Sequence, residues 1–129
     1  MASVEAALIA ALKASSGVGG VVGARVFIVG GRQGAEYPYV TIQRISTAGA
    51  RRLDGANTLE WPRFQVSSWG ATALDALNTA EAVRLAIDNI TVAGDPTITA
   101  TFQNQDGPEP DPETRNFRVL QDYFVFHSR

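Results

Sequence analysis

The sequence of 129 residues contains no cysteine and a single histidine, His127. Without cysteine the chain has no disulfide, no thiolate metal site and no cysteine nucleophile. One histidine rules out a metal site built on a histidine cluster. It also leaves a Ser–His–Asp triad with one candidate base, and the G-x-S-x-G motif that accompanies such a nucleophile is missing. We therefore expect no catalytic residue, no metal site and no bound cofactor.

Long apolar runs and a dominant charge are missing as well. No segment approaches the roughly 20 apolar residues that a membrane-spanning helix needs. Eleven Lys and Arg residues are scattered among thirteen Asp and Glu, with a formal net charge of −2, so the basic stripe typical of a sequence-reading DNA-binding protein is absent. Near the N-terminus, Glu5 stands where a signal peptide carries positive charge. We expect a protein that stays in the cytoplasm, with residues 1–129 forming one domain.

The most informative stretch is Leu59–Ile90, which predicts a strand, a tight turn and a long helix. Side chains of the strand alternate, with Phe64 and Val66 on one side and Trp61 and Trp69 on the other. The hydroxyl of Thr72 can cap the helix, with Asp75 three residues further on. The apolar face of this helix consists of Ala73, Ala76, Leu77, Ala80, Val83 and Ile87. Its small side chains suit close packing against a sheet.

A second helix is predicted at the N-terminus, where Ser3 is the expected cap and Ser16 the expected end. The glycines of Gly17–Gly23 follow this helix and precede a strand, the opposite of their order in a phosphate-binding loop. They also lack a Gly-Lys-Ser/Thr ending. We interpret this segment as a turn, or as a short helical turn that Gly23 closes.

Four further strands are predicted at Arg25–Val29, Tyr39–Ile45, Thr97–Phe102 and Arg115–Phe126. Ser46–Thr58 is rich in Gly and Ala and too long for a tight hairpin, so we expect a projecting, mobile arm with Arg51 and Arg52 near its tip. Asn104–Thr114 holds three prolines and four acidic residues, which predicts an exposed loop. This loop lacks the Asp-x-Asp-x-Asp-Gly framework of a calcium site.

These elements predict an α/β (α+β) fold in the order α-β-β-β-α-β-β, with two helices on one face of a mostly antiparallel sheet of four to five strands. In the last strand Tyr123 and Val125 face one way and Phe124 and Phe126 the other, which indicates burial on both sides. Because two helices leave the second sheet face uncovered, we expect a homo-oligomer. The residues assigned to its subunit interface are Trp61, Trp69, Tyr123 and Val125. The alternative is a half-open sheet with partly exposed aromatic side chains.

The order and spacing of these elements match a known family. The residues that carry the match are Val4-Glu5-Ala6-Ala7-Leu8 with Ala11-Leu12, Arg25-Val26-Phe27, Tyr37-Pro38-Tyr39-Val40-Thr41-Ile42, Pro62-Arg63-Phe64-Gln65-Val66, Ala76 through Asp88, and Phe117-Arg118-Val119 with Asp122-Tyr123-Phe124-Val125. With these residues the chain resembles the small tail-completion, or tail-terminator, proteins of long-tailed (siphovirus-like) bacteriophages and gene transfer agents. The match covers nearly the whole chain, except Gly94–Glu113.

The resemblance implies a hexameric ring on the head-proximal end of a tail tube, assembled in the host cytoplasm and carried in the particle. Such a ring ends polymerisation of the tube and offers a docking surface to the head connector. Its implied partners are further copies of itself, the major tail tube protein and the head-completion or connector protein, while DNA passes through the lumen without specific binding. The residues hypothesised to make the axial contacts are Arg51, Arg52, Leu53 and Asp54 in the arm, and Glu109 and Asp111 in the acidic loop.

Two other functions remain open from the sequence. One is a head-side neck or head-closure protein, which also forms a ring between portal and tail. The other is a small cytoplasmic binding or regulatory domain that dimerises through its open sheet face.

Overall fold

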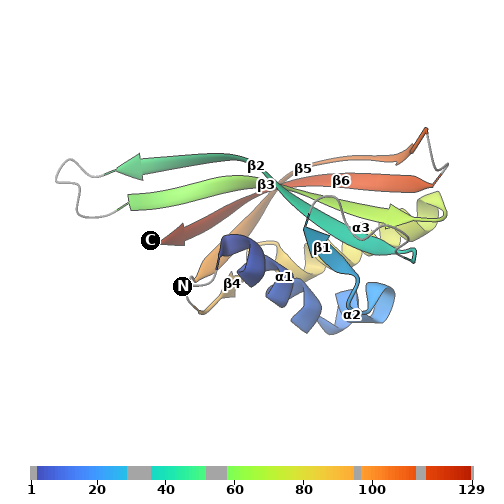
Figure 1. Ribbon diagram of the computed structural model, residues 1–129, viewed down its shortest axis with the longest axis horizontal. Coiled ribbons are helices and arrows are strands. Elements are labelled where there is room, and N and C mark those ends of the chain that lie inside the picture. Colours follow the sequence, from blue (N-terminus) through green and yellow to red (C-terminus); the bar gives the residue numbers. More distant parts are fainter. Residues whose placement is uncertain (1–2, 29–35, 52–57, 95–96, 113–115, 129) are drawn as a thin grey trace.

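The computed structural model describes residues 3–28, 36–51, 58–94, 97–112 and 116–128. Within them the chain forms a mixed α+β fold with one twisted sheet, and all three helices lie on the same side of it (Figure 1). The elements are, in order, α1 (Val4–Ala14), α2 (Ser16–Val22), β1 (Val26–Ile28), β2 (Tyr39–Arg51), β3 (Thr58–Gly70), α3 (Ala73–Ile87), β4 (Thr91–Val92), β5 (Ile98–Pro110) and β6 (Phe117–Ser128).

The sheet has six strands in the order β1-β2-β3-β6-β5-β4. Every neighbouring pair is antiparallel except β1 and β2, which are parallel. The fold class is thus as predicted, but the expected four to five strands were too few. The additional strand is β4, which has only two residues and is therefore too short to show an alternation of apolar and polar side chains in the sequence.

The glycine-rich segment after α1 is a helix of its own, so the prediction of two helices was also wrong. The hydroxyl of Ser15 accepts a hydrogen bond from the amide of Val18 at 3.3 Å, which caps the start of α2. Gly23 ends it with a positive φ of 61°, in agreement with the helical-turn interpretation. Val18 and Val22 are buried, and their burial offsets the helix-destabilising effect of the glycines.

Helix α3 begins as the sequence predicts. The hydroxyl of Thr72 accepts from the amide of Asp75 at 3.1 Å, and the buried residues of the helix are Ala76, Thr79, Ala80, Val83 and Ile87. Before the helix, Gly70 ends β3 in close contact with its first turn. A Cβ added at Gly70 would lie 2.5 Å from the amide nitrogen of Ala76, so this approach requires glycine.

The described part of the predicted mobile arm Ser46–Thr58 is strand. Strand β2 continues to Arg51, which pairs with Thr58 of β3, and the ladder shifts register between Arg44 and Ser46. The Ala and Gly residues of the predicted arm that precede Arg51 therefore belong to a long antiparallel ladder. They can do so because hydrogen bonding between the backbones of two strands does not depend on bulky side chains. Residues 52–57, including Arg52, Leu53 and Asp54, lie outside the described residues.

The predicted acidic loop Asn104–Thr114 is also mostly strand. Strand β5 runs to Pro110 and pairs with β6, with irregularities between Phe102 and Asn104 and between Asp106 and Glu109. Gly107, at a φ of 98°, sits in the second irregularity. Strand β5 has only the two-residue β4 on its outer side, so it is an edge strand over most of its length. Proline and acidic residues are tolerated there and protect the edge from pairing with other chains.

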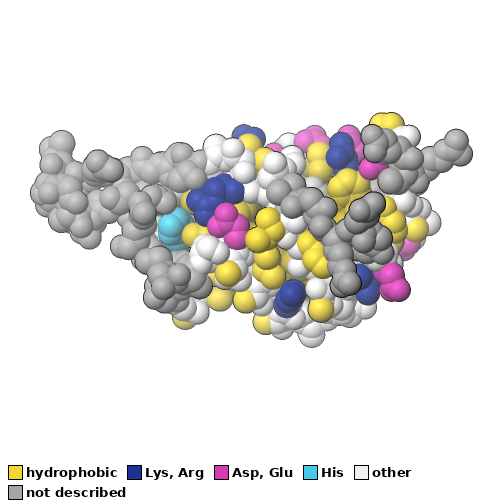
Figure 2. All heavy atoms as spheres, viewed as in Figure 1, with side chains coloured by type: hydrophobic (Ala, Val, Ile, Leu, Met, Phe, Trp, Pro, Cys, Tyr) yellow, Lys and Arg dark blue, Asp and Glu magenta, His cyan; other side chains and the backbone are white. Residues whose placement is uncertain are grey.

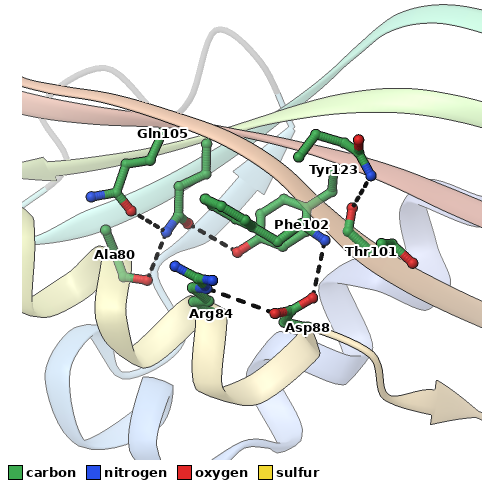
Figure 3. A network of polar contacts seen from close by, with 9 residues as sticks. Ala80, Arg84, Asp88, Thr101, Phe102, Gln105 and Tyr123 are labelled. Atoms are coloured by element: carbon green, nitrogen blue, oxygen red, sulfur yellow. Dashed lines mark hydrogen bonds and ion pairs between the residues drawn. The ribbon is translucent and has the colours of Figure 1, made fainter.

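The core lies between the helices and the sheet, and a polar network connects α3 to β5 and β6 (Figure 3). Gln121 is fully buried; its amide nitrogen donates to the carbonyl of Ala80 at 3.1 Å and to Oε1 of Gln105 at 2.9 Å. Its Oε1 accepts from the hydroxyl of Tyr123 at 3.2 Å. Burial raises the pKa of Tyr123, so the ring stays a neutral donor. The side-chain amide of this buried glutamine is thus hydrogen-bonded at both its nitrogen and its oxygen.

Candidate assembly surface

The helices cover only one face of the sheet, and we call the opposite face the open face. Alternation along the strands and the register between them place the following residues on it: Tyr39, Thr41 and Gln43 of β2, Trp61, Arg63, Gln65, Ser67 and Trp69 of β3, Arg118, Leu120, Asp122, Phe124 and Phe126 of β6, and Thr99 and Thr101 of β5. In the part of the chain that the structure describes, no helix packs on this face (Figure 1).

A row of four interacting side chains crosses one end of the open face. Tyr39, Trp69, Arg118 and Glu109 occupy directly opposed positions on β2, β3, β6 and β5. The rings of Tyr39 and Trp69 are stacked, with centroids 5.8 Å apart. The guanidinium of Arg118 lies over the Trp69 ring at 5.6 Å, and its Nε is 2.8 Å from Oε1 of Glu109. We call this set the Tyr39–Glu109 row, and its contacts stabilise the sheet across four strands.

The surroundings of this row shift the ionisation of Tyr39. Partial burial, followed by the neighbouring Tyr37 and the carboxylate of Asp111, raises the pKa of Tyr39 to about 12. The ring of Tyr37 lies 5.2 Å from that of Tyr39. Asp111, predicted to be an axial contact, therefore lies near the same end of the sheet as Glu109. The backbone amide of Asp111 donates to the carbonyl of Asn116 at 2.7 Å and closes the turn between β5 and β6.

A second aromatic contact occupies the other end of the open face. The rings of Trp61 and Phe126 lie 6.1 Å apart, and 37% of the surface of Phe126 is exposed. Trp61 and Trp69, both assigned to the subunit interface, thus lie on the open face. Tyr123 and Val125 do not, because both are fully buried beneath the helices. The assignment of Tyr123 and Val125 to an interface was therefore wrong, because both belong to the core, and the accessible aromatic residues of β6 are Phe124 and Phe126.

The two predicted axial segments lie at opposite ends of the sheet. Arg51 is the last residue of β2, whereas Glu109 and Asp111 lie where β5 ends and turns toward β6. Because β2 and β5 run in opposite directions along the same long sheet, these ends are far apart in Figure 1. Arg51 and Glu109 are therefore separated by the full length of the open face.

The described residues were also compared with three kinds of functional feature: metal clusters, charged patches and membrane-spanning helices. The described residues include no group of three or more His, Cys, Asp or Glu side chains that could hold a metal ion. Cationic and anionic side chains are intermixed on the face in Figure 2, without a patch of one sign. Among the described helices none alone is long and apolar enough to cross a membrane, and α1 with α2 reach that length only as a pair bent by 84°.

Sequence reasoning missed the contributions of Tyr39 and Arg118 to this surface. Tyr39 lies on the same side of its strand as Thr41 and Gln43. The alternation in the sequence therefore indicated which side of the strand Tyr39 occupies, but not which side chains it contacts on other strands. The strand order that brings β2, β3, β6 and β5 together was needed to find the row.

Comparisons with known proteins identify a family and a similar fold. The family model described as "Tail completion protein gp17" matches residues 6–128. A chain from the structure titled "Virion of native gene transfer agent (GTA) particle" superposes with a TM-score of 0.78, covering 98% of this chain and 96% of that chain. The two are 18% identical, so this likeness concerns the fold. No curated protein matches the chain.

Proposed function

The chain belongs to the family described as tail completion protein gp17, and from this we propose that it forms a ring that caps the head-proximal end of a tail tube. Family membership makes it a structural protein located in the tail of a phage or gene transfer agent particle. The ring, its hexameric state and its partners are our proposal. We also propose that residues 1–129 act as one tail-terminator-like domain.

The observation that carries this proposal is the separation of the two candidate axial segments. A terminator needs one surface that resembles the next ring of the tube and a different surface that a tube subunit cannot extend. The hairpin of β2 and β3, which contains Arg51, stands at one end of the sheet, and the acidic turn with Glu109 and Asp111 at the other. With the long axis of the sheet along the tail axis, each end would meet a different partner.

The open face suits contacts between neighbouring subunits around the ring. Its two aromatic contacts, at Tyr39–Trp69 and at Trp61–Phe126, supply apolar area of the kind that protein interfaces use. The open face lies between the two axial ends and leaves both ends accessible. Association through it would place the tube protein on one side of the ring and the head connector on the other.

No step of this function requires catalysis or a cofactor. Termination follows if a ring binds the last tube ring and presents a second surface on which tube subunits do not assemble. DNA would pass through the lumen, and a net charge of −2 suits a channel that does not retain phosphate.

Deletion of the gene tests the proposal. Negative-stain microscopy of the resulting particles should reveal overlong, irregular tubes that are not attached to heads. Tails of normal length beside unattached heads would instead place the protein on the head side of the joint. Intact particles with attached tails would contradict both functions.

A further inference from the structure

The outer surface of helix α3 carries the two most exposed large apolar side chains in the described part of the chain. Leu74 is 64% exposed and Leu85 is 72% exposed. They belong to one stripe with Asn78 and Glu81, because residues at positions 74, 78, 81 and 85 fall on the same side of an α-helix. We call these four residues the α3 stripe. The stripe lies opposite the buried face of the helix and therefore points away from the sheet.

We propose that the α3 stripe of one copy of this chain docks on the open face of the next copy. The inference rests on the proposed ring and names the two surfaces that build it. The helix stripe and the open face lie on opposite sides of the protomer, so a contact between them is head-to-tail. Repetition of a head-to-tail contact produces a closed ring when the rotations between successive subunits add up to a full turn. A face that pairs with the same face of another copy produces only a two-fold dimer.

Spacing along the two surfaces supports the contact. Glu81 and Leu85 are about 6 Å apart along the helix at 1.5 Å per residue. On the open face, Arg63 and Trp61 are two residues apart, or about 6.6 Å at 3.3 Å per residue. Leu85 can therefore pack on the aromatic contact of Trp61 and Phe126 while Glu81 reaches Arg63.

The charges on the two surfaces are complementary. Arg63 and Glu81 are both exposed, and neither has an ion pair or hydrogen-bonded side-chain partner among the residues that the structure describes. Arg84, which follows Glu81 on α3, is engaged with Asp88 at 3.7 Å and with the ring of Phe102 at 3.9 Å. Glu81 is therefore available to a cation from another copy, and Arg63 to an anion.

Leu74 extends the contact at the other end of the stripe. It precedes Leu85 by eleven residues, which places it about 16 Å away along the helix. This distance carries it over the middle of the open face toward Leu120, a half-buried apolar side chain of β6 on that face. Two apolar contacts flanking one ion pair would fix both the position and the direction of α3 on the neighbouring sheet.

Thiol-specific cross-linking tests the contact directly, because the native chain has no cysteine. Variants Arg63→Cys and Glu81→Cys are purified separately, mixed and treated with a bismaleimide, both as free protein and in isolated tails, because an ion pair between two long side chains holds their Cα atoms beyond the reach of a direct disulfide. The expected product is a covalent dimer of one chain of each variant, well above the dimer formed by either variant alone. The control pairs Arg63→Cys with Lys13→Cys, an exposed residue of α1 outside the stripe.

A chain carrying both Arg63→Cys and Glu81→Cys distinguishes the types of assembly. The two positions lie on opposite sides of one protomer, so their cross-links join different copies. A head-to-tail contact gives a ladder of products beyond the dimer, up to the closed ring. Products that stop at the dimer, or no enrichment over the control, would overturn the inference.

Charge exchange checks the energetic role of the pair at surface positions that do not affect folding. Arg63→Glu and Glu81→Arg should each weaken self-association more than about tenfold through like-charge contacts. An equimolar mixture of the two variants should restore it, because every contact in an alternating ring then joins opposite charges. Failure of the mixture to recover would contradict the pairing.

The outcomes separate this inference from the proposed function. Gene deletion that yields overlong tubes, together with no Arg63–Glu81 cross-link, would retain the cap and reject this interface. Cross-linked ladders together with normal tails in the deletion strain would retain the interface and reject the cap.

Discussion

The indole of Trp69 lies nearly parallel to the phenol ring of Tyr39, with an interplanar angle of 14° and centroids 5.8 Å apart. The indole Nε1 also donates a hydrogen bond to the hydroxyl of Thr41, at 3.1 Å. Both contacts span β2 and β3 on the open face. They hold Tyr39 in a half-buried position where the neutral phenol is favoured over the phenolate.

Tyr39 is therefore expected to ionise near pH 12 instead of near pH 10. Its pKa is raised in the folded state, so the stability it contributes is complete below the unfolded pKa of 10.0 and falls as the pH rises through about 12. Tyr39→Phe should make unfolding by urea less dependent on pH in this range. The absorbance difference between wild type and Tyr39→Phe isolates the titration of this ring, and ionisation near pH 10 would contradict the assignment.

The ion pair between Glu5 and Arg44 predicts a pH dependence at the acidic end. Arg44 Nη2 lies 2.7 Å from Oε1 of Glu5 and Nε lies 3.2 Å from Oε2, which ties α1 to β2. Partial burial raises the pKa of Glu5, but the hydrogen bonds and charge of Arg44 outweigh it, so the net pKa is lowered. The stabilisation of the fold by the Glu5–Arg44 pair is thus complete above pH 4.5, the pKa of Glu5 in the unfolded chain. It is lost as the pH falls through the lower pKa that Glu5 has in the folded protein.

Glu5→Gln should accordingly destabilise the fold by about 0.5–1 kcal/mol at neutral pH and remove that part of the acid dependence. Urea denaturation between pH 3 and pH 7 measures both effects, with pH limits set around the ordinary glutamate pKa. Glu36→Gln is the matched control, because Glu36 is exposed, lies outside the proposed contact and has no ion pair among the described residues. Equal curves for the two variants would show that the Glu5–Arg44 pair contributes nothing measurable.

Two glycine-to-alanine substitutions should change stability in opposite directions. A Cβ at Gly70 would lie 2.5 Å from the amide nitrogen of Ala76 and 2.8 Å from Cβ of Asp75, so Gly70→Ala should cost about 1–3 kcal/mol. Gly20 lies inside α2, where a Cβ would meet no atom within 4 Å apart from the chain neighbours and the backbone of its own helix. Gly20→Ala should therefore stabilise the protein by about 0.5–1 kcal/mol. Urea unfolding of both variants tests the packing of β3 on α3, and an unchanged midpoint for Gly70→Ala would contradict it.

Much of the fold could be predicted from local patterns. The alternation of Phe64 and Val66 against Trp61 and Trp69 identified both sides of β3, and Thr72 identified the start of α3. Strand ends were predicted less well, because the outer parts of β2 and β5 are held by backbone pairing with β3 and β6. Their own sequences, rich in Ala and Gly or in Pro and acids, favour other conformations in isolation.

The candidate surface was predictable only in part, for the same physical reason. A sequence reveals which residues of β6 share a side, but which side the helices cover depends on the packing of the whole domain. Tyr123 and Val125 were for this reason assigned to an interface although they are core residues. Glu109 was predicted as an exposed acid, whereas its ion pair with Arg118 depends on the register between β5 and β6.

The two ends of the sheet should affect different steps of particle assembly. Replacing both Arg51 and Arg52 with Glu reverses the charge at the hairpin end, and replacing Glu109 and Asp111 with Lys reverses it at the opposite end. Each double variant should leave the fold intact, as judged by circular dichroism, and should reduce the yield of joined particles at least about tenfold through like-charge contacts. Because Glu109 binds Arg118, a Glu109→Gln variant controls for loss of that pair alone.

The location of the defect identifies the partner at each end. The variant that fails on the tube side should give overlong tubes, because the ring no longer binds the last tube ring. The variant that fails on the connector side should give tails of normal length that remain separate from heads. Negative-stain microscopy of both strains distinguishes these products. Normal yields from the Arg51→Glu, Arg52→Glu variant would exclude the hairpin end as an axial contact, and the same defect from both variants would exclude an axial polarity along β2 and β5.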